Sequence, residues 1–352
     1  FVWQTSIQAP LVMASAAIGF SQYLTYLVHL DTMQQHLVSG GLIIFVCFLL
    51  YRNIETVGKL SVFLWSVVIL TVIWIIVSGL THRQQDIPML PSGSSSFFSF
   101  AFWGAVGHAS IKTVYSYLGY YNVCHLGGEI RNPEVNIPRS IMISIAGITG
   151  LYLLMNFSVM SVIPWQSVKA DDQYLVSTFI EKIYGHSAAV VATVLILWIA
   201  MASLFALVLG YSRVPFAAAT DGNFFRVFAK LHPTKNFPYV SLLVMCGIGF
   251  LFSLRMKMTD VINSILAMRI IVQFMAQAVG VVLLRKKNGK GSLPFRMWLY
   301  PLPVIVSLLI WAFLFYHTGW YALYGTCIAL LGLGVFFIFR YATRKKALSA
   351  AS

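Results

Sequence analysis

Hydrophobic residues run through this chain in long continuous blocks that are separated by short polar stretches. Several blocks approach or exceed the roughly 20 residues that a helix needs to cross a bilayer. The runs are continuous rather than alternating, which argues against a membrane β-barrel. The pattern predicts an all-α polytopic membrane protein with one transmembrane domain, 1–352, and ten spans, at residues 7–30, 36–51, 57–80, 103–126, 138–164, 187–213, 238–255, 259–285, 298–317 and 320–341.

Composition supports this class, because 59% of the residues are hydrophobic and only 10% are charged. Soluble domains carry about 25% charged residues. The net charge of +14 would suit nucleic acid, but most Lys and Arg fall in loops on one side of the ten-span arrangement. Cytoplasmic loops carry such an excess, so the charge predicts a cytoplasmic residue 1, a lipid bilayer with anionic headgroups as the partner, and no nucleic acid.

Signals for other classes of chemistry are missing from the sequence. The four cysteines lack metal-ligand spacing and are expected to be free thiols within or beside spans. Enzyme motifs and paired intramembrane carboxylates do not occur, so no catalytic residues, metal or cofactor are expected. The chain begins without Met at the edge of a hydrophobic span, which we interpret as a missing natural N-terminus.

The fourth span holds an unusual mixture of aromatic, polar and small residues from Tyr115 to Asn122. Gly119 weakens a helix by about 1 kcal/mol relative to Ala. A break between Ser116 and Gly119 would expose backbone N–H and C=O groups, and such half-helix ends bind charged substrate groups in transporters. The alternative interpretation is a Tyr-rich interfacial belt in which Gly allows close helix packing.

At its inner end this span runs into Glu129-Ile-Arg-Asn-Pro-Glu-Val-Asn-Ile-Pro-Arg139, where we expect a tight turn, an N-cap at Asn136 and Pro138 in the first turn of the next helix. The segment resembles the hallmark of amino acid permeases in the amino acid–polyamine–organocation superfamily, and most of all the L-type amino acid transporter branch. A second motif is similar to a loop of that family: GYSRVPFAAATDG at 210–222, followed by Leu-His-Pro at 231–233 and Phe-Pro-Tyr at 237–239.

The resemblance implies a LeuT-type fold, a five-plus-five inverted repeat followed by two helices. On that reading residues 1–80 are the remainder of the first repeat, 103–285 the second repeat and 298–341 the two additional helices, while the first two helices are absent. It also implies a secondary amino acid transporter, a permease or exchanger that works by alternating access. The alternative is a truncated or transport-inactive relative, or a subunit that needs a partner or its missing helices.

Several site residues follow from the resemblance. Tyr115 corresponds to an aromatic gate, and Ser116, Tyr117, Leu118 and Gly119 to the unwound segment that meets the substrate amino group; Asn122 and Gln8 are further candidates for substrate binding. Lys59 and Ser203 correspond to positions at the second sodium site, which implies sodium-independent or proton-coupled transport. Position alone would also allow Lys59 to be a snorkelling lysine. The broken span carries no acid near its centre, so we expect neutral amino acids, and we expect a bacterial inner membrane.

Further polar residues lie in or beside the spans. Arg269, Gln273 and Gln277 are spaced by four residues, which predicts one helical face and either a pore-lining role or hydrogen bonds between helices. Lys112 could reach a substrate or the outer headgroups. Glu129 near Arg139 or Arg213 suggests an inner ion pair that biases gating, with loop capping as the alternative.

Overall fold

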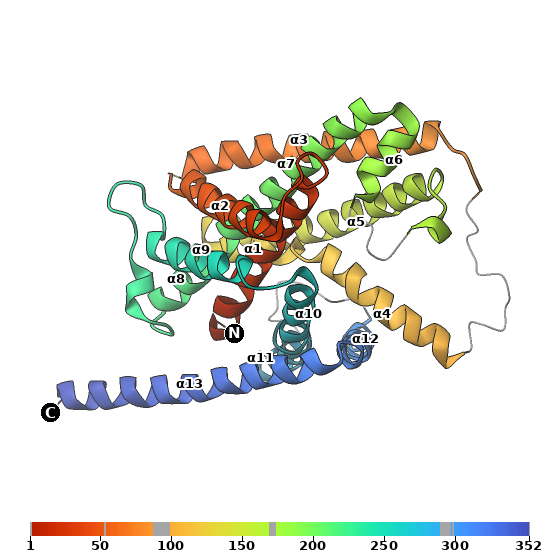
Figure 1. The fold of residues 1–352 in the computed structure, drawn as a ribbon. Coiled ribbons are helices and arrows are strands. Elements are labelled where there is room, and N and C mark those ends of the chain that lie inside the picture. The colour runs from red at the N-terminus through yellow and green to blue at the C-terminus, as the bar shows by residue number, and fades with distance from the viewer. Residues whose placement is uncertain are drawn as a thin grey trace. The chain divides into compact units, whose positions relative to one another are not determined.

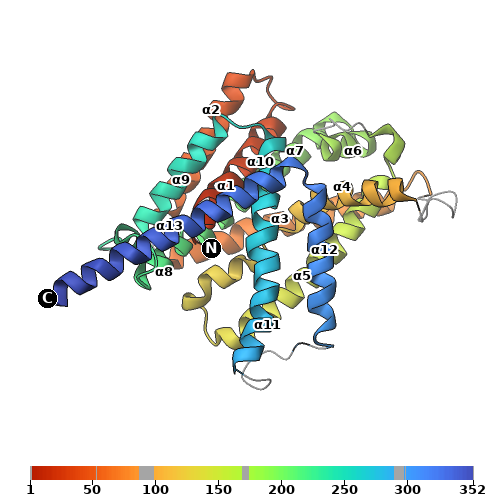
Figure 2. The ribbon, with the colours of Figure 1, turned by 90° about the horizontal axis from the view of Figure 1, so that it is seen from below.

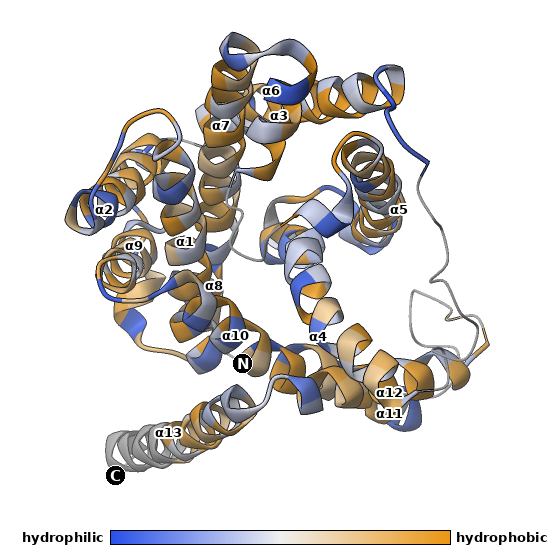
Figure 3. Cartoon of the chain, turned by 45° about the vertical axis from the view of Figure 1, so that its right-hand side comes forward, coloured by the Kyte–Doolittle hydropathy of each residue, from blue (hydrophilic) through white to orange (hydrophobic). Residues whose placement is uncertain are grey.

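The structure, a computed structural model, describes residues 2–52, 54–86, 99–168, 174–288, 297 and 299–351. All regular structure within these residues is helical (Figure 1). Six of the helical stretches are long and apolar enough to cross a membrane, and hydrophobic residues cover most of α3, α5 and α12 (Figure 3). The predicted class, an all-α polytopic protein, is therefore confirmed.

The helices follow the predicted spans with shifted ends and several interruptions. The α-helices are α1 (Val2–Leu24), α2 (Thr32–Leu50), α3 (Ile54–Thr81), α4 (Phe100–Tyr117), α5 (Pro133–Met160), α6 (Leu175–Tyr184), α7 (His186–Tyr211), α8 (Arg213–Thr220), α9 (Tyr239–Ser253), α10 (Met258–Arg269), α11 (Ala276–Asn288), α12 (Leu302–His317) and α13 (Trp320–Ala351). The remaining elements are the 3-10 helices η2 (Tyr120–Glu129), η3 (Trp165–Ser167) and η4 (Arg226–Ala229), and the π-helix η5 (Ile270–Met275).

Three boundaries differ from the prediction for local reasons. The first span ends at Leu24 rather than at residue 30. The second begins at Thr32 rather than at residue 36, because Asp31 caps it by accepting from the Gln34 backbone N–H at 2.7 Å. The fifth span begins at Pro133, so the N-cap assigned to Asn136 was wrong. Asn132 takes that position in a left-handed conformation, φ 48°, and Pro133 suits the first helical position.

The eighth span is not the single regular helix that the sequence predicted. It consists of α10, the π-helix η5 and α11 in succession. A π-helix closes its hydrogen bonds from residue i to i+5, so side chains four apart no longer align along one face. The expected common face is therefore wrong for one residue: Arg269 and Gln273 are buried, whereas Gln277 is exposed.

The chain forms two compact units. The first comprises Phe1–Gln8, Phe97–Ser116 and Thr259–Ser352, and the second comprises Ala9–Ser96 and Tyr117–Met258. In the first unit α11 and α12 lie side by side (Figure 2), and the Phe274 ring of η5 stacks on Trp311 of α12 with centroids 4.3 Å apart. In the second unit α3 packs against α5 and α7, and α2 lies beside α9.

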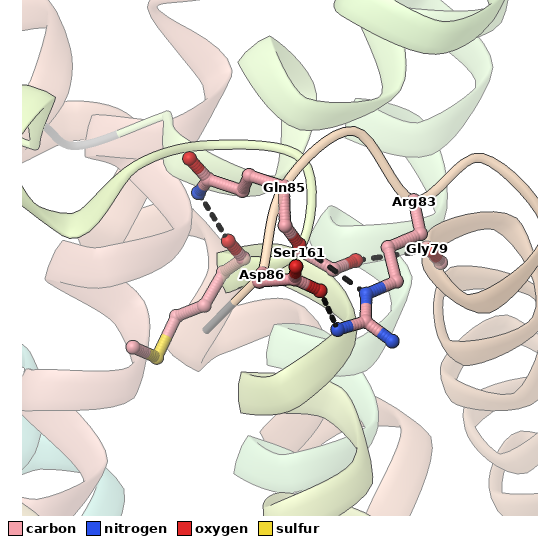
Figure 4. Close-up of polar contacts among 6 residues, drawn as sticks. Gly79, Arg83, Gln85, Asp86 and Ser161 are labelled. Carbon is pink, nitrogen blue, oxygen red and sulfur yellow. Dashed lines mark hydrogen bonds and ion pairs between the residues drawn. The ribbon is translucent and has the colours of Figure 1, made fainter. Parts of the chain in front are cut away.

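Contacts in the second unit join segments that the charge pattern places on the same side of the membrane. At the predicted outer side, Ser161 donates from Oγ to the Gly79 carbonyl at 3.0 Å, and its own carbonyl accepts from the backbone N–H of Gln85 at 3.1 Å (Figure 4). At the predicted inner side, Lys235 donates to the Tyr51 carbonyl at 2.9 Å. These pairings agree with helices that cross the membrane in alternating directions.

Candidate functional site

The backbone changes course where the sequence predicts a break in the fourth span. Helix α4 ends at Tyr117, and Gly119 follows with φ 126° and ψ −21°. Side chains other than hydrogen are strained at such a positive φ, so glycine suits this position. The 3-10 helix η2 then begins at Tyr120, and the Asn122 backbone N–H donates to the Gly119 carbonyl at 2.9 Å. The last carbonyls of α4 therefore lack the continuing helix that would normally bond them.

The boundary between the two units falls at this break. Tyr115 and Ser116 belong to the first unit, whereas the residues from Tyr117 onward belong to the second. Tyr115 is half-buried, and the Ser116 hydroxyl donates to the Lys112 carbonyl at 3.1 Å. The Tyr117 ring packs edge-on against Tyr152 of α5, with centroids 5.2 Å apart. The division between the two units therefore falls within the segment 115–119 of the sequence.

The 3-10 helix after the break presents polar side chains to α7. A Cβ on Gly210 would lie 3.7 Å from the Asn122 Cβ, and the His125 ring lies 5.3 Å from the buried Tyr211 ring. Side chains at i and i+3 eclipse in a 3-10 helix, so Asn122 and His125 share a face. Asn122 Oδ1 and His125 Nε2 are buried and have no hydrogen-bond partner among the described residues.

These two polar atoms are costly in a packed interior. A buried polar group without a hydrogen bond costs about 1–3 kcal/mol. Asn122 is a candidate from the sequence, whereas His125 is not among the sequence-based candidates. The signal that could have found His125 is its three-residue spacing from Asn122, which places the two on one side of a helix.

A cavity of about 420 Å³ lies between α3 and α7. Ser203 lines this cavity together with Ser61, Trp65 and other mainly apolar residues. Lys59 is exposed on α3, is not among the lining residues, and makes no hydrogen bond or ion pair with a described residue. Ser203 therefore lines a cavity, whereas Lys59 does not line that cavity.

The remaining candidates are scattered. In the first unit, Gln8 is buried and donates to the Ile265 carbonyl at 3.2 Å, which fixes the start of α1 to α10. Lys112 and Arg139 are exposed, and Arg213 donates from Nη1 to the Leu209 carbonyl at 2.7 Å. The predicted inner ion pair involves Glu129, whose side chain lies outside the described residues. No cluster of three metal-ligating side chains occurs in the described part of the chain.

Comparison with known proteins identifies the family. A profile described as "Amino acid permease" matches residues 1–337. The chain belongs to the amino acid permease family. It is therefore an integral, multi-pass membrane protein of a transporter family and not an enzyme, and the resemblance inferred from the two motifs is confirmed.

Individual relatives of this permease are distant. The uncharacterized amino acid permease YecA of Bacillus subtilis is 24% identical over 70% of this chain and 56% of its own length. The serine/threonine exchanger SteT of the same organism is 22% identical over 87% of this chain and 68% of its own. The large neutral amino acids transporter small subunit 2 of Mus musculus is 28% identical over 82% of this chain and 52% of its own. The chain thus spans between half and about two thirds of these three relatives.

Proposed function

We propose that the protein carries amino acids across a membrane by alternating access. The observation that carries this proposal is the break after Tyr117 in a chain of the amino acid permease family. Interrupted helices place unsatisfied backbone groups at the depth of a bilayer, where they hold charged parts of a substrate.

We propose that the main chain from Ser116 to Gly119 meets the substrate and that Tyr115 closes its outer side. The half-buried position of Tyr115, two residues before the end of α4, supports this role. Asn122 adds a side-chain oxygen with no described hydrogen-bond partner one turn beyond the break. Neutral amino acids fit a break without a carboxylate, and the substrates for which two relatives are named, serine/threonine and large neutral amino acids, are of that class.

We further propose transport without sodium, with Lys59 supplying the positive charge that a sodium ion supplies in coupled relatives. Lys59 lies on α3 with no described carboxylate partner, and Ser203 lines the cavity between α3 and α7. Exchange or proton coupling would then drive accumulation, and a bacterial inner membrane is the setting we propose.

Uptake by proteoliposomes tests these proposals separately. The protein, expressed from its complete reading frame, should accumulate labelled serine, threonine or leucine against an unlabelled internal pool. Uptake should be equal in sodium and in choline buffers, and strict sodium dependence would refute the role of Lys59. Tyr115→Ala should lower uptake at least tenfold while Tyr115→Phe retains it. Equal uptake by the two variants would refute the gate, and no uptake of any amino acid would refute transport itself.

A further inference from the structure

Two arginines from separate elements line one small depression at the predicted inner side of the second unit. Arg52 follows the end of α2, and Arg213 is the first residue of α8. The depression is otherwise mainly apolar, with buried Leu50, Val57 and Phe237 among its lining residues. Residues far apart in the sequence thus place two arginines in the lining of one mainly apolar depression.

Hydrogen bonds hold the charged group of Arg213 in place. Arg213 donates from Nη1 to the Leu209 carbonyl at 2.7 Å and to the Ser212 hydroxyl at 3.3 Å, which anchors its guanidinium. A third cation contacts the residue that precedes Arg52: the Lys235 ammonium lies 2.9 Å from the Tyr51 carbonyl oxygen and 4.9 Å from the centroid of the Tyr51 ring. Neither Arg52 nor Lys235 has an ion-pair partner among the described side chains.

The adjoining connection between α8 and α9 is both basic and apolar on its surface. Phe225, Val227 and Leu231 are 51%, 46% and 44% exposed, and they alternate with Arg226 and Lys230. Its short helix η4 contacts α8 and α9, the elements that contribute Arg213 and Leu242 to the depression. Exposed apolar side chains interleaved with basic ones are typical of a segment that lies in the membrane interface.

We propose that this depression binds the headgroup of an anionic phospholipid. Guanidinium groups bind phosphate oxygens through paired, charge-assisted hydrogen bonds. A lipid phosphate at the rim would place its acyl chains beside the exposed apolar residues of the α8–α9 connection. A free inorganic anion could use the arginines but would leave those apolar residues in water, so the surroundings favour the lipid. The proposal does not depend on the transport activity.

Lipid retention measures this binding directly. The delipidated protein would be titrated with phosphatidylglycerol or phosphatidylcholine in detergent, and bound lipid counted by native mass spectrometry. Phosphatidylglycerol should be retained in preference to phosphatidylcholine. Arg52→Gln and Arg213→Gln should each weaken retention about fivefold, the factor that corresponds to roughly 1 kcal/mol per basic residue near an anionic membrane. Arg226→Gln is the matched control, because Arg226 is an exposed arginine of the neighbouring connection that does not line the depression.

Three results would overturn the proposal. Equal retention of the two lipids would show that charge recognition is absent. An equal loss in Arg226→Gln and Arg52→Gln would show only a diffuse surface charge. Displacement of phosphatidylglycerol by millimolar inorganic phosphate would assign the arginines to a soluble anion. Because Arg213 also binds its own helix, thermal unfolding of each variant is measured in parallel, and Arg52→Gln, which removes no described hydrogen bond, keeps the test valid if Arg213→Gln unfolds.

Discussion

The close approach of α3 and α5 makes a sharp prediction for Gly79. A Cβ at this position would lie 2.5 Å from both the Cβ and the backbone oxygen of the buried Ser158. Carbon atoms prefer separations of about 3.5–4.0 Å. Alanine therefore requires α3 and α5 to separate by roughly 1 Å, and the obstructing atoms are not the movable end of a long side chain.

The cost can be estimated from the contacts that the separation disturbs. Overpacking costs about 1–3 kcal/mol. The Ser158 hydroxyl donates to the Ile76 carbonyl at 3.1 Å and the Ser161 hydroxyl to the Gly79 carbonyl at 3.0 Å. Weakening each adds about 0.5–1.5 kcal/mol. The better helix propensity of alanine offsets about 1 kcal/mol of this destabilisation. Gly79→Ala should therefore destabilise the protein by about 1–5 kcal/mol.

Gly58 provides the matched control on the same helix. A Cβ there would meet nothing within 4 Å, so Gly58→Ala should be neutral or stabilising by up to about 1 kcal/mol. Thermal unfolding in detergent can be followed with a thiol-reactive dye, because Cys246 is buried in the folded state. The midpoint of Gly79→Ala should fall by several degrees, at about 2–4 °C per kcal/mol. Equal midpoints for the two variants would refute the argument from helix contact.

Two further predictions concern other contacts of the second unit. Cys47 on α2 and the buried Cys246 on α9 lie on two helices that pack against each other. Oxidation by copper phenanthroline should therefore give an intramolecular disulfide in peptide maps, and its absence would contradict the packing of α2 on α9. Hydrogen bonds from Tyr26 and His186 lower the pKa of the Glu181 carboxyl, so the contact stabilises the fold above the usual carboxyl pKa and is lost as the pH falls through the lowered value. The midpoint difference between wild type and Glu181→Gln should shrink between pH 5 and pH 3, and a difference that persists at pH 3 would contradict this sign.

The sequence predicted the membrane class and most spans because these depend on continuous apolar runs, which a bilayer requires. It did not predict α6 within the expected loop 165–186. This helix has only ten residues, too few to cross a bilayer, and it is amphipathic. Its Phe179 and Ile180 are fully buried, and Ser177 bonds Thr193 of α7 at 2.8 Å. A span search overlooks such a helix because its stability comes from packing against its neighbours.

The candidate site shows the same division between local and tertiary information. The break at Gly119 was readable because glycine at a positive φ is a local property of the chain. The neighbours of Asn122 and His125 could not be predicted, because the approach of Gly210 and Tyr211 from α7 is a tertiary contact. On a regular α-helix a spacing of three leaves these two residues about 60° apart on neighbouring positions, and the tighter 3-10 helix brings them into line.

The predicted common face of Arg269, Gln273 and Gln277 in the eighth span was wrong for the opposite reason. Spacings of four residues gave a clear α-helical face, but six residues of π-helix separate Arg269 from α11. The wider turn rotates everything that follows, so Gln277 leaves the buried face that Arg269 and Gln273 share. Short π-helical segments often mark functional positions, and they carry no distinctive sequence signal. A buried arginine at the start of such a segment is therefore a stronger candidate for the transport path than its regular spacing to the two glutamines suggested.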